Sequence, residues 1–296
     1  MIGIVTDSTV GLPPAVAASL GITIVPLVIL FDQEAVLDGV DLDSAALFRR
    51  LEAAPVFPHT SQPSPAAFVQ AYSRLIAAGA EGILVIVLSA RLSGTYQTAQ
   101  LARELLPDEL RQVPIEIIDS QSAAIGMLPA VLQAAEEARQ GHTLAEIRAH
   151  AQEVLARTHF LGVLDTLEFA RRNGRLNGVL ATLGDLLDLK PILVLERGDI
   201  VAAGLARSRR RACHQIAQLV RTMRPIERVI LGESSPGAAD ELRSELQAIY
   251  SGELPLYPLG AALALNTGPG TAAIAVVSRS PLSAGFSRSA EGERFT

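Results

Sequence analysis

The chain has 296 residues and a net charge of −6, with 49% hydrophobic and 19% charged residues. This length suits two domains of ordinary size, and the acidic balance disfavours a nucleic-acid binder, which needs basic patches to neutralise phosphates. A single cysteine, Cys213, excludes an intrachain disulfide framework and a tetrahedral cysteine zinc site.

The apolar stretches are the length of strands. The longest lie around Ile24–Phe31 and Ile83–Leu88, well short of the roughly 20 residues that a membrane-spanning helix needs. We therefore expect no stable membrane insertion. The first strand begins at Met1–Ile4 with no basic, apolar leader before it, so we expect no signal peptide and a cytoplasmic location.

Short runs rich in valine and isoleucine alternate along the chain with longer stretches of helical periodicity. The predicted strands are Ile2–Thr6, Ile22–Leu30, Ile83–Leu88, Ile115–Ile118, Phe160–Leu164, Ile192–Leu195, Arg228–Leu231, Leu254–Tyr257 and Ala273–Val277. The predicted helices lie at about 13–20, 44–53, 65–78, 95–106, 121–140, 143–157, 165–173, 208–223 and 237–250. Strands that alternate with helices imply crossover connections and a largely parallel α/β sheet.

Two consecutive helical stretches, 121–140 and 143–157, interrupt this alternation. We place a domain boundary just after them, near Thr158. The prediction is an N-terminal α/β domain at 1–158 and a C-terminal α/β domain at 159–280. The remaining residues, 281–296, are small and polar, which favours a disordered tail.

Hydroxyl-bearing residues gather where predicted strands pass into helices, at Thr6–Thr9, Thr60–Pro65, Ser89–Ala99 and Asp119–Ala123. Ligands of open α/β sheets bind beyond the strand ends, against helix N-termini. The same residue types cap helices without any ligand, and that is the commoner reason for them. At the third junction Gly94 allows close approach to the backbone, while Ser93 adds a donor. A carboxylate or phosphate fits there, and the lack of an obvious base favours binding over catalysis.

An ordered set of motifs resembles the DegV family of bacterial fatty-acid-binding proteins, from the start of the chain to about Ser278. The motifs are TSQPSP, LSGTYQTA, IIDSQSA, LEFARRNGRL, LKPIL and NTGPGTAAIAV. The resemblance implies an N-terminal α/β domain with a parallel sheet and a C-terminal mixed α/β domain. It also implies one bound long-chain fatty acid and no cofactor. The partner that it implies is a fatty acid kinase, which phosphorylates the bound carboxylate for phospholipid synthesis.

The same resemblance assigns the ligand-binding residues. It gives the carboxylate to Thr60 or Ser61 and to Ser93 beside Gly94, and it makes Arg175 a candidate for contact near the entrance. The family often has histidine where this chain has Asn266, followed by Thr267. Asparagine can donate a hydrogen bond, but it cannot carry a positive charge or shuttle a proton.

Two other functions remain open from the sequence. A serine-dependent acyl hydrolase or transferase would use Ser93 or Ser61 as nucleophile, and His59 is the one base that the sequence offers nearby. A binder of another small anion would use the same helix starts.

A cluster of basic residues opens one of the predicted helices. By default it is a solvated face, but it would also steer an acidic kinase partner. It consists of Arg207, Arg209, Arg210 and Arg211.

Overall fold

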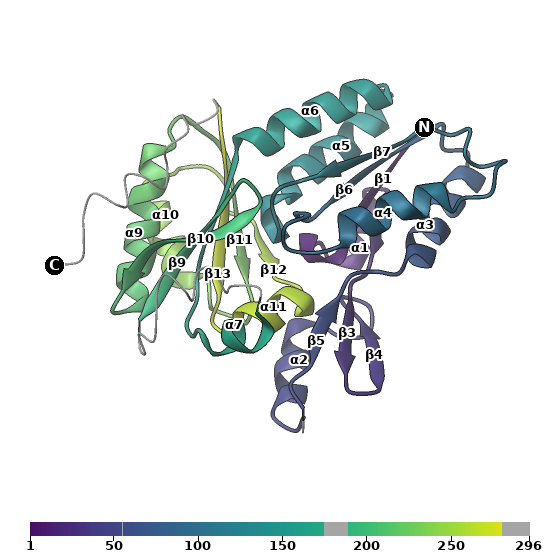
Figure 1. Cartoon of the computed structure of the whole chain (residues 1–296). Coiled ribbons are helices and arrows are strands. Elements are labelled where there is room, and N and C mark those ends of the chain that lie inside the picture. Colours follow the sequence, from purple (N-terminus) through teal and green to yellow (C-terminus); the bar gives the residue numbers. More distant parts are fainter. Residues whose placement is uncertain (55, 175–188, 280–296) are drawn as a thin grey trace.

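The computed structural model describes residues 1–54, 56–174 and 189–279, so the predicted tail at 281–296 lies outside the described residues. A parallel sheet with helices on both faces stands beside a second, larger sheet (Figure 1). A small third sheet lies at one end of the two.

The first sheet is entirely parallel, with the order β2-β1-β6-β7. Its strands are β1 (Ile2–Asp7), β2 (Ile22–Val25), β6 (Gly82–Val87) and β7 (Ile115–Asp119). Every residue of β6 is buried, as expected for a central parallel strand that is covered on both faces. Because the chain leaves β1 toward β2 on one side and reaches β6 on the other, the strand order switches between β1 and β6.

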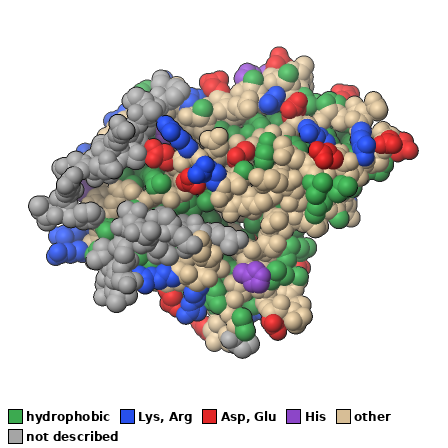
Figure 2. Space-filling view, in the orientation of Figure 1, with side chains coloured by type: hydrophobic (Ala, Val, Ile, Leu, Met, Phe, Trp, Pro, Cys, Tyr) green, Lys and Arg blue, Asp and Glu red, His purple; other side chains and the backbone are tan. Residues whose placement is uncertain are grey.

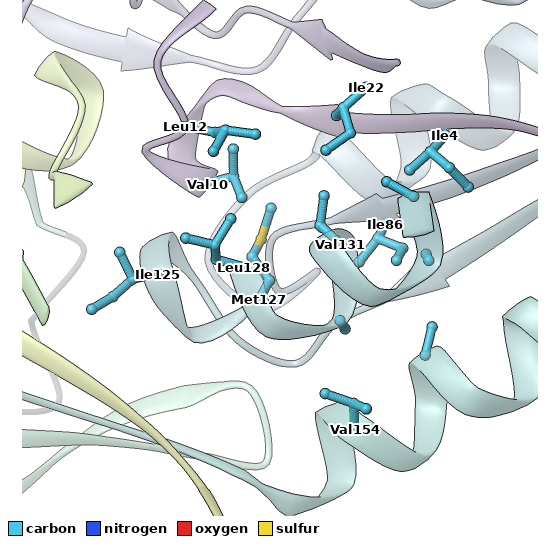
Figure 3. Packing of buried hydrophobic residues seen from close by; sticks show 14 of the residues in the cluster. Ile4, Val10, Leu12, Ile22, Ile86, Ile125, Met127, Leu128, Val131 and Val154 are labelled. Atoms are coloured by element: carbon cyan, nitrogen blue, oxygen red, sulfur yellow. The ribbon is translucent and has the colours of Figure 1, made fainter. Parts of the chain in front are cut away.

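Alternate residues of these strands pack against different helices. One face meets α3 (Pro65–Ala77) and α4 (Thr95–Glu104), and the other meets α5 (Leu128–Gln140) and α6 (Leu144–Arg157). Figure 3 shows Ile4 and Ile86 of the sheet turned toward Val131 of α5. The helix starts carry the expected caps: Ser64 accepts a hydrogen bond from the backbone N–H of Ala67, and Thr143 forms a capping box.

The second sheet is mixed, with the order β10-β9-β8-β13-β11-β12, and only β11 and β12 pair in parallel. Its strands are β8 (Thr158–Val163), β9 (Lys190–Glu196), β10 (Asp199–Ala206), β11 (Ile226–Glu233), β12 (Leu256–Pro258) and β13 (Ala272–Ser278). One face is covered by α9 (Arg209–Thr222) and α10 (Asp240–Gln247). From the other face, Ile230, Ala273 and Ala275 join the core cluster of the first sheet. The predicted α/β class, with a parallel N-terminal and a mixed C-terminal sheet, is confirmed.

The small sheet is antiparallel and combines distant parts of the chain. Its order is β4-β3-β5, formed by Glu34–Leu37, Val28–Phe31 and His59–Ser61. It shares a core cluster with α2 (Ser44–Leu51) and α11 (Ala261–Thr267). Helix α11 therefore packs on residues more than 200 positions earlier in the sequence. The division near Thr158 stays a prediction.

The bounds of two predicted elements were wrong, and a proline accounts for the difference in each. The predicted strand Ile22–Leu30 is two strands in different sheets, since Pro26 has no N–H to give to a ladder. The predicted helix at 121–140 begins only at Leu128, after a short 3-10 turn, η2 (Ala124–Gly126), because Pro129 belongs in a first helical turn.

Other elements were not predicted. They are β4, β5, β10 and α11, which are short or rich in alanine and glycine. Strand β10 follows β9 through a two-residue hairpin, in which Arg197 and Gly198 have φ values of 51° and 85°. The predicted helices near 165–173 and 13–20 are present as α7 (Glu168–Asn173) and α1 (Pro14–Ser19).

Candidate functional site

A cavity opens at the carboxyl ends of β1 and β6, where the strand order of the first sheet switches. Thr9 and Leu88, which follow these two strands, line it. Neighbouring connections diverge at a switch point and leave a crevice, which is the usual ligand position in open α/β sheets. The second sheet closes the crevice from the opposite side.

The wall supplied by the second sheet is apolar and mostly buried. Phe160 and Gly162 of β8 and Leu164 just after it line the cavity, and Leu193 and Ala273 do so from the two neighbouring strands. Such a surface, formed by three adjacent strands, offers aliphatic contact and almost no hydrogen bonding. It suits a long apolar ligand.

The polar end of the cavity contains six of the seven sequence-predicted binding residues, each half-buried. They come from β5, from the start of α4 and from the end of α11, and they are Thr60, Ser61, Ser93, Gly94, Asn266 and Thr267. The seventh, Arg175, lies outside the described residues. Helix α11 contacts β5, and the Cβ position of Gly94 lies 3.2 Å from the side chain of Gln62, which follows β5. Three segments far apart in the sequence thus bring hydroxyl and amide groups together in the lining of an apolar cavity.

The start of α4 is arranged to receive a negatively polarised group. Gly94 is its N-cap and provides no side-chain cap, so the first N–H groups of the helix depend on other acceptors. The Ser93 Oγ lies 2.9 Å from the Thr95 Oγ1 and accepts from the Thr95 N–H at 3.3 Å. A Cβ on Gly94 would come within 3.2 Å of the Gln62 side chain. Glycine at this position therefore lets another cavity residue pack against the helix start.

The Asn266 side chain uses one of its two amide N–H donors within its own helix. Its amide Nδ2 donates to the carbonyl of Ala262 at 2.7 Å, one turn earlier in α11. Its Oδ1 is buried and has no hydrogen-bond partner among the described residues. An unpaired buried acceptor costs about 1–3 kcal/mol. Asn266 thus suits a donor in the cavity, such as the O–H of a protonated carboxyl group.

Two buried aspartates hold the loops around the cavity, and neither was among the predicted binding residues. Asp7 accepts from the backbone N–H of Leu88 at 2.7 Å, which ties the end of β1 to the end of β6. Asp38 accepts from the Ser8 hydroxyl at 2.6 Å and from the N–H of Ala262 at 3.1 Å. Burial raises the pKa of the Asp7 carboxyl and raises the pKa of the Asp38 carboxyl to about 6. The TDST motif was a signal for Asp7, whereas no local pattern marks Asp38.

The rim of the cavity links the two sheets. The Ser89 hydroxyl, just after β6, donates to the carbonyl of Gly198 at 2.7 Å in the β9–β10 hairpin. Beside it, Arg91 and Asp199 form an exposed ion pair at 2.5 Å. A Cβ on Gly198 would lie 2.6 Å from the Ser89 Oγ. The glycine is therefore required by contact as well as by its positive φ.

The described lining of the cavity carries no ionisable side chain. His59, the base that an acyl hydrolase would need, is exposed on β5 and is not among the lining residues. Neither Ser61 nor Ser93 has a histidine or carboxylate beside it in that lining. Activation of a serine nucleophile needs such a neighbouring base.

The predicted basic cluster is divided in the structure. Arg209 lies mostly buried, 2.9 Å from Asp165, and also donates to the carbonyls of Gly270 and Ala238. It therefore stabilises the packing of loops on the second sheet and does not belong to a docking face. On the face drawn in Figure 2, acidic and basic side chains are interspersed.

No helix in the described ranges combines the length and apolar character that crossing a membrane requires.

Comparison with known proteins places this cavity in a family context. A sequence model for the DegV family of uncharacterised proteins matches residues 1–279. A DegV domain-containing protein of Deinococcus radiodurans is 34% identical over 288 residues, which cover 96% of this chain and 99% of the relative.

Solved structures agree with this match. One solved structure is described as fatty acid binding of a DegV family protein from Thermus thermophilus. It is 34% identical to this chain, and the two superpose with a TM-score of 0.84 over 94% of this chain and 99% of the other. DegV from Bacillus subtilis, described as a fatty acid binding protein, is 25% identical with a TM-score of 0.81 and the same coverage.

Proposed function

Because the chain belongs to the DegV family, we propose that it binds one long-chain fatty acid in this cavity and does not convert it chemically. The observation that carries the proposal is the division of the cavity into a buried apolar wall and a half-buried, uncharged polar end. The Thermus thermophilus relative, which is 34% identical, is described as binding fatty acid.

The energetics are consistent with this ligand. Burying an acyl chain contributes about 0.8 kcal/mol per methylene, so a long chain contributes roughly 10 kcal/mol before the costs of association. A buried carboxylate without partners would cost several kcal/mol or become protonated. The hydroxyls of Thr60, Ser61 and Ser93 offset that cost for the ionised form, and the free Oδ1 of Asn266 accepts from the protonated form.

The finer part of the proposal concerns presentation of the head group. The polar end is half-buried, whereas the wall residues Gly162, Leu193 and Ala273 are buried. The carboxyl group therefore lies nearer to solvent than the acyl chain does, where a cytoplasmic fatty acid kinase would reach it. In this proposal the protein is a carrier, and the kinase supplies the chemistry.

The direct test is extraction of the purified protein with organic solvent, followed by mass spectrometry. We expect one long-chain fatty acid per chain. A protein that is empty and takes up no labelled fatty acid would contradict the carrier function. A stoichiometric short polar anion would instead support the small-anion alternative.

Ser93→Ala is expected to weaken fatty-acid binding by about 1–3 kcal/mol, roughly 5- to 150-fold in Kd, because it removes a donor from the head-group end. Displacement of a fluorescent fatty acid measures the change. Ser64→Ala is the matched control, since Ser64 also accepts a backbone N–H at a helix start, at 3.2 Å, but does not line the cavity. Equal affinity of the two variants would remove Ser93 from the site.

A further inference from the structure

Three potential metal ligands meet at the turn between α5 and α6, outside the cavity lining. They are Glu137, His142 and His150, and their ligand atoms all lie within 4.8 Å of one another. Figure 1 shows α5 and α6 side by side, both covering one face of the first sheet. We propose that these three residues bind a divalent transition-metal ion, with Zn²⁺ as the ion that the ligand set suits best.

The chemistry of the ligand set matches this ion. Two imidazoles and one carboxylate, with water in the fourth position, form a familiar Zn²⁺ ligand set. Ligand atoms about 2.0–2.2 Å from a tetrahedral ion lie about 3.3 Å from one another. The His150 Nδ1 is 3.0 Å from the Glu137 Oε1, close to this separation, and the third ligand atom lies within 4.8 Å of both, so side-chain movements of about 1–2 Å bring the three ligands to the ion.

The state of Glu137 is the second, independent observation. Its exposed fraction is 9%, and its Oε1 accepts from Gln133 and His150 at 2.9 and 3.0 Å. Its Oε2 is buried and has no hydrogen-bond partner among the described residues. The carboxylate also lies in the last turn of α5, where the helix dipole disfavours negative charge. A cation at this position would relieve both the unpaired oxygen and the dipole.

The backbone around the site is well defined. Gly141, with φ of 85°, caps the end of α5, and the N–H of His142 donates a hydrogen bond to the carbonyl of Glu137 at 3.1 Å. The capping box of Thr143 and Glu146 then starts α6, which carries His150. The three ligands therefore come from two packed helices and a fixed turn, so a bound ion would connect α5 to α6.

A simple histidine–carboxylate hydrogen bond is the competing explanation, and the chain contains a matched example of one. His214 and Glu245 are also joined at 3.0 Å between Nδ1 and a carboxylate oxygen. No second histidine completes a cluster there within the described residues. This pair is an internal control for the effect of the third ligand.

The test uses the full chain after treatment with a chelator. We expect one Co²⁺ per chain, with the visible absorption of a four-coordinate ion that Zn²⁺ then displaces. Zn²⁺ should also raise the thermal unfolding midpoint. His142→Gln and His150→Gln should each weaken binding at least roughly tenfold, whereas His214→Gln should leave it unchanged.

Absence of stoichiometric binding would overturn the proposal. An unaffected His142→Gln would do the same, because it would reduce the site to a histidine–carboxylate pair. Glu137→Gln is not used to decide the question, because replacing a buried carboxylate also changes the stability of the fold. The two histidines are half-buried, so circular dichroism should show folded variants, and these decide the question.

Discussion

Gly162→Leu is expected to weaken fatty-acid binding more than roughly 100-fold while leaving the protein folded. Gly162 lies in β8, between Ala273 of β13 and Leu193 of β9, and all three line the apolar wall. A Cβ at this position would meet its nearest atoms, in Ala272 and Ala273, at 3.4 and 3.9 Å, which is ordinary contact. The rest of the leucine side chain must then occupy space that the acyl chain would fill.

The size of this effect follows from the methylenes that lose their place. A leucine side chain displaces about three or four of them, which corresponds to roughly 3 kcal/mol, or more than 100-fold in Kd. Titration with labelled fatty acid measures it. Gly204→Leu is the control, because Gly204 is a strand glycine of the same sheet with ordinary contacts and does not line the cavity. An unchanged Kd in Gly162→Leu would mean that the acyl chain does not run along β8.

The elements that were predictable from sequence are those in which local and tertiary preferences agree. The β6 segment is apolar at nearly every position, and a strand buried on both faces needs that pattern. Helix α3 begins where Ser64 and Pro65 indicate, because capping depends on residues three or four positions apart. Such signals do not require knowledge of the rest of the fold.

The elements that were missed depend on distant contacts. Helix α11 is a short run of alanine and leucine, and its buried residues pack on the small sheet. Asp38 is polar in the sequence and looks like a surface turn residue, yet it bonds to Ser8 and to Ala262, 30 and 224 residues away. Nothing within a local window predicts either interaction.

The candidate site was partly predictable for the same reason. Ser93 and Gly94 belong to a helix start, which the sequence marks, so the polar end of the cavity was open to prediction. The apolar wall was not, because Gly162 and Ala273 have the composition of any core strand. Only the arrangement of the sheets shows that these side chains face a cavity rather than one another.

Asp38, just after β4 of the small sheet, is hydrogen-bonded to the start of α11. Because it is buried, we expect it to make the free energy of unfolding depend on pH. Its exposed fraction is 1%, and its partners are the Ser8 hydroxyl and the N–H of Ala262 near the start of α11. Burial raises its pKa from 3.8 to about 6, and the nearby charge of Asp7 adds to the shift. Between pH 3.8 and about 6 the native chain therefore holds a proton that the unfolded chain has lost.

This difference predicts that the free energy of unfolding falls as pH rises through that window, by roughly 3 kcal/mol for Asp38 at 1.36 kcal/mol per pKa unit. Asp38→Asn should remove this loss. The free energy of unfolding of the variant minus that of the native protein should therefore rise by about that amount between pH 4 and pH 7. Burial also raises the pKa of Asp7, so the free energy of unfolding of the variant should still fall somewhat as pH rises. Urea unfolding across this range measures both curves, with Asp41→Asn as a control in the same loop, where the side chain is exposed. Parallel curves for the native protein and Asp38→Asn would show that Asp38 does not hold the proton, and the link between α11 and the small sheet would then be independent of pH.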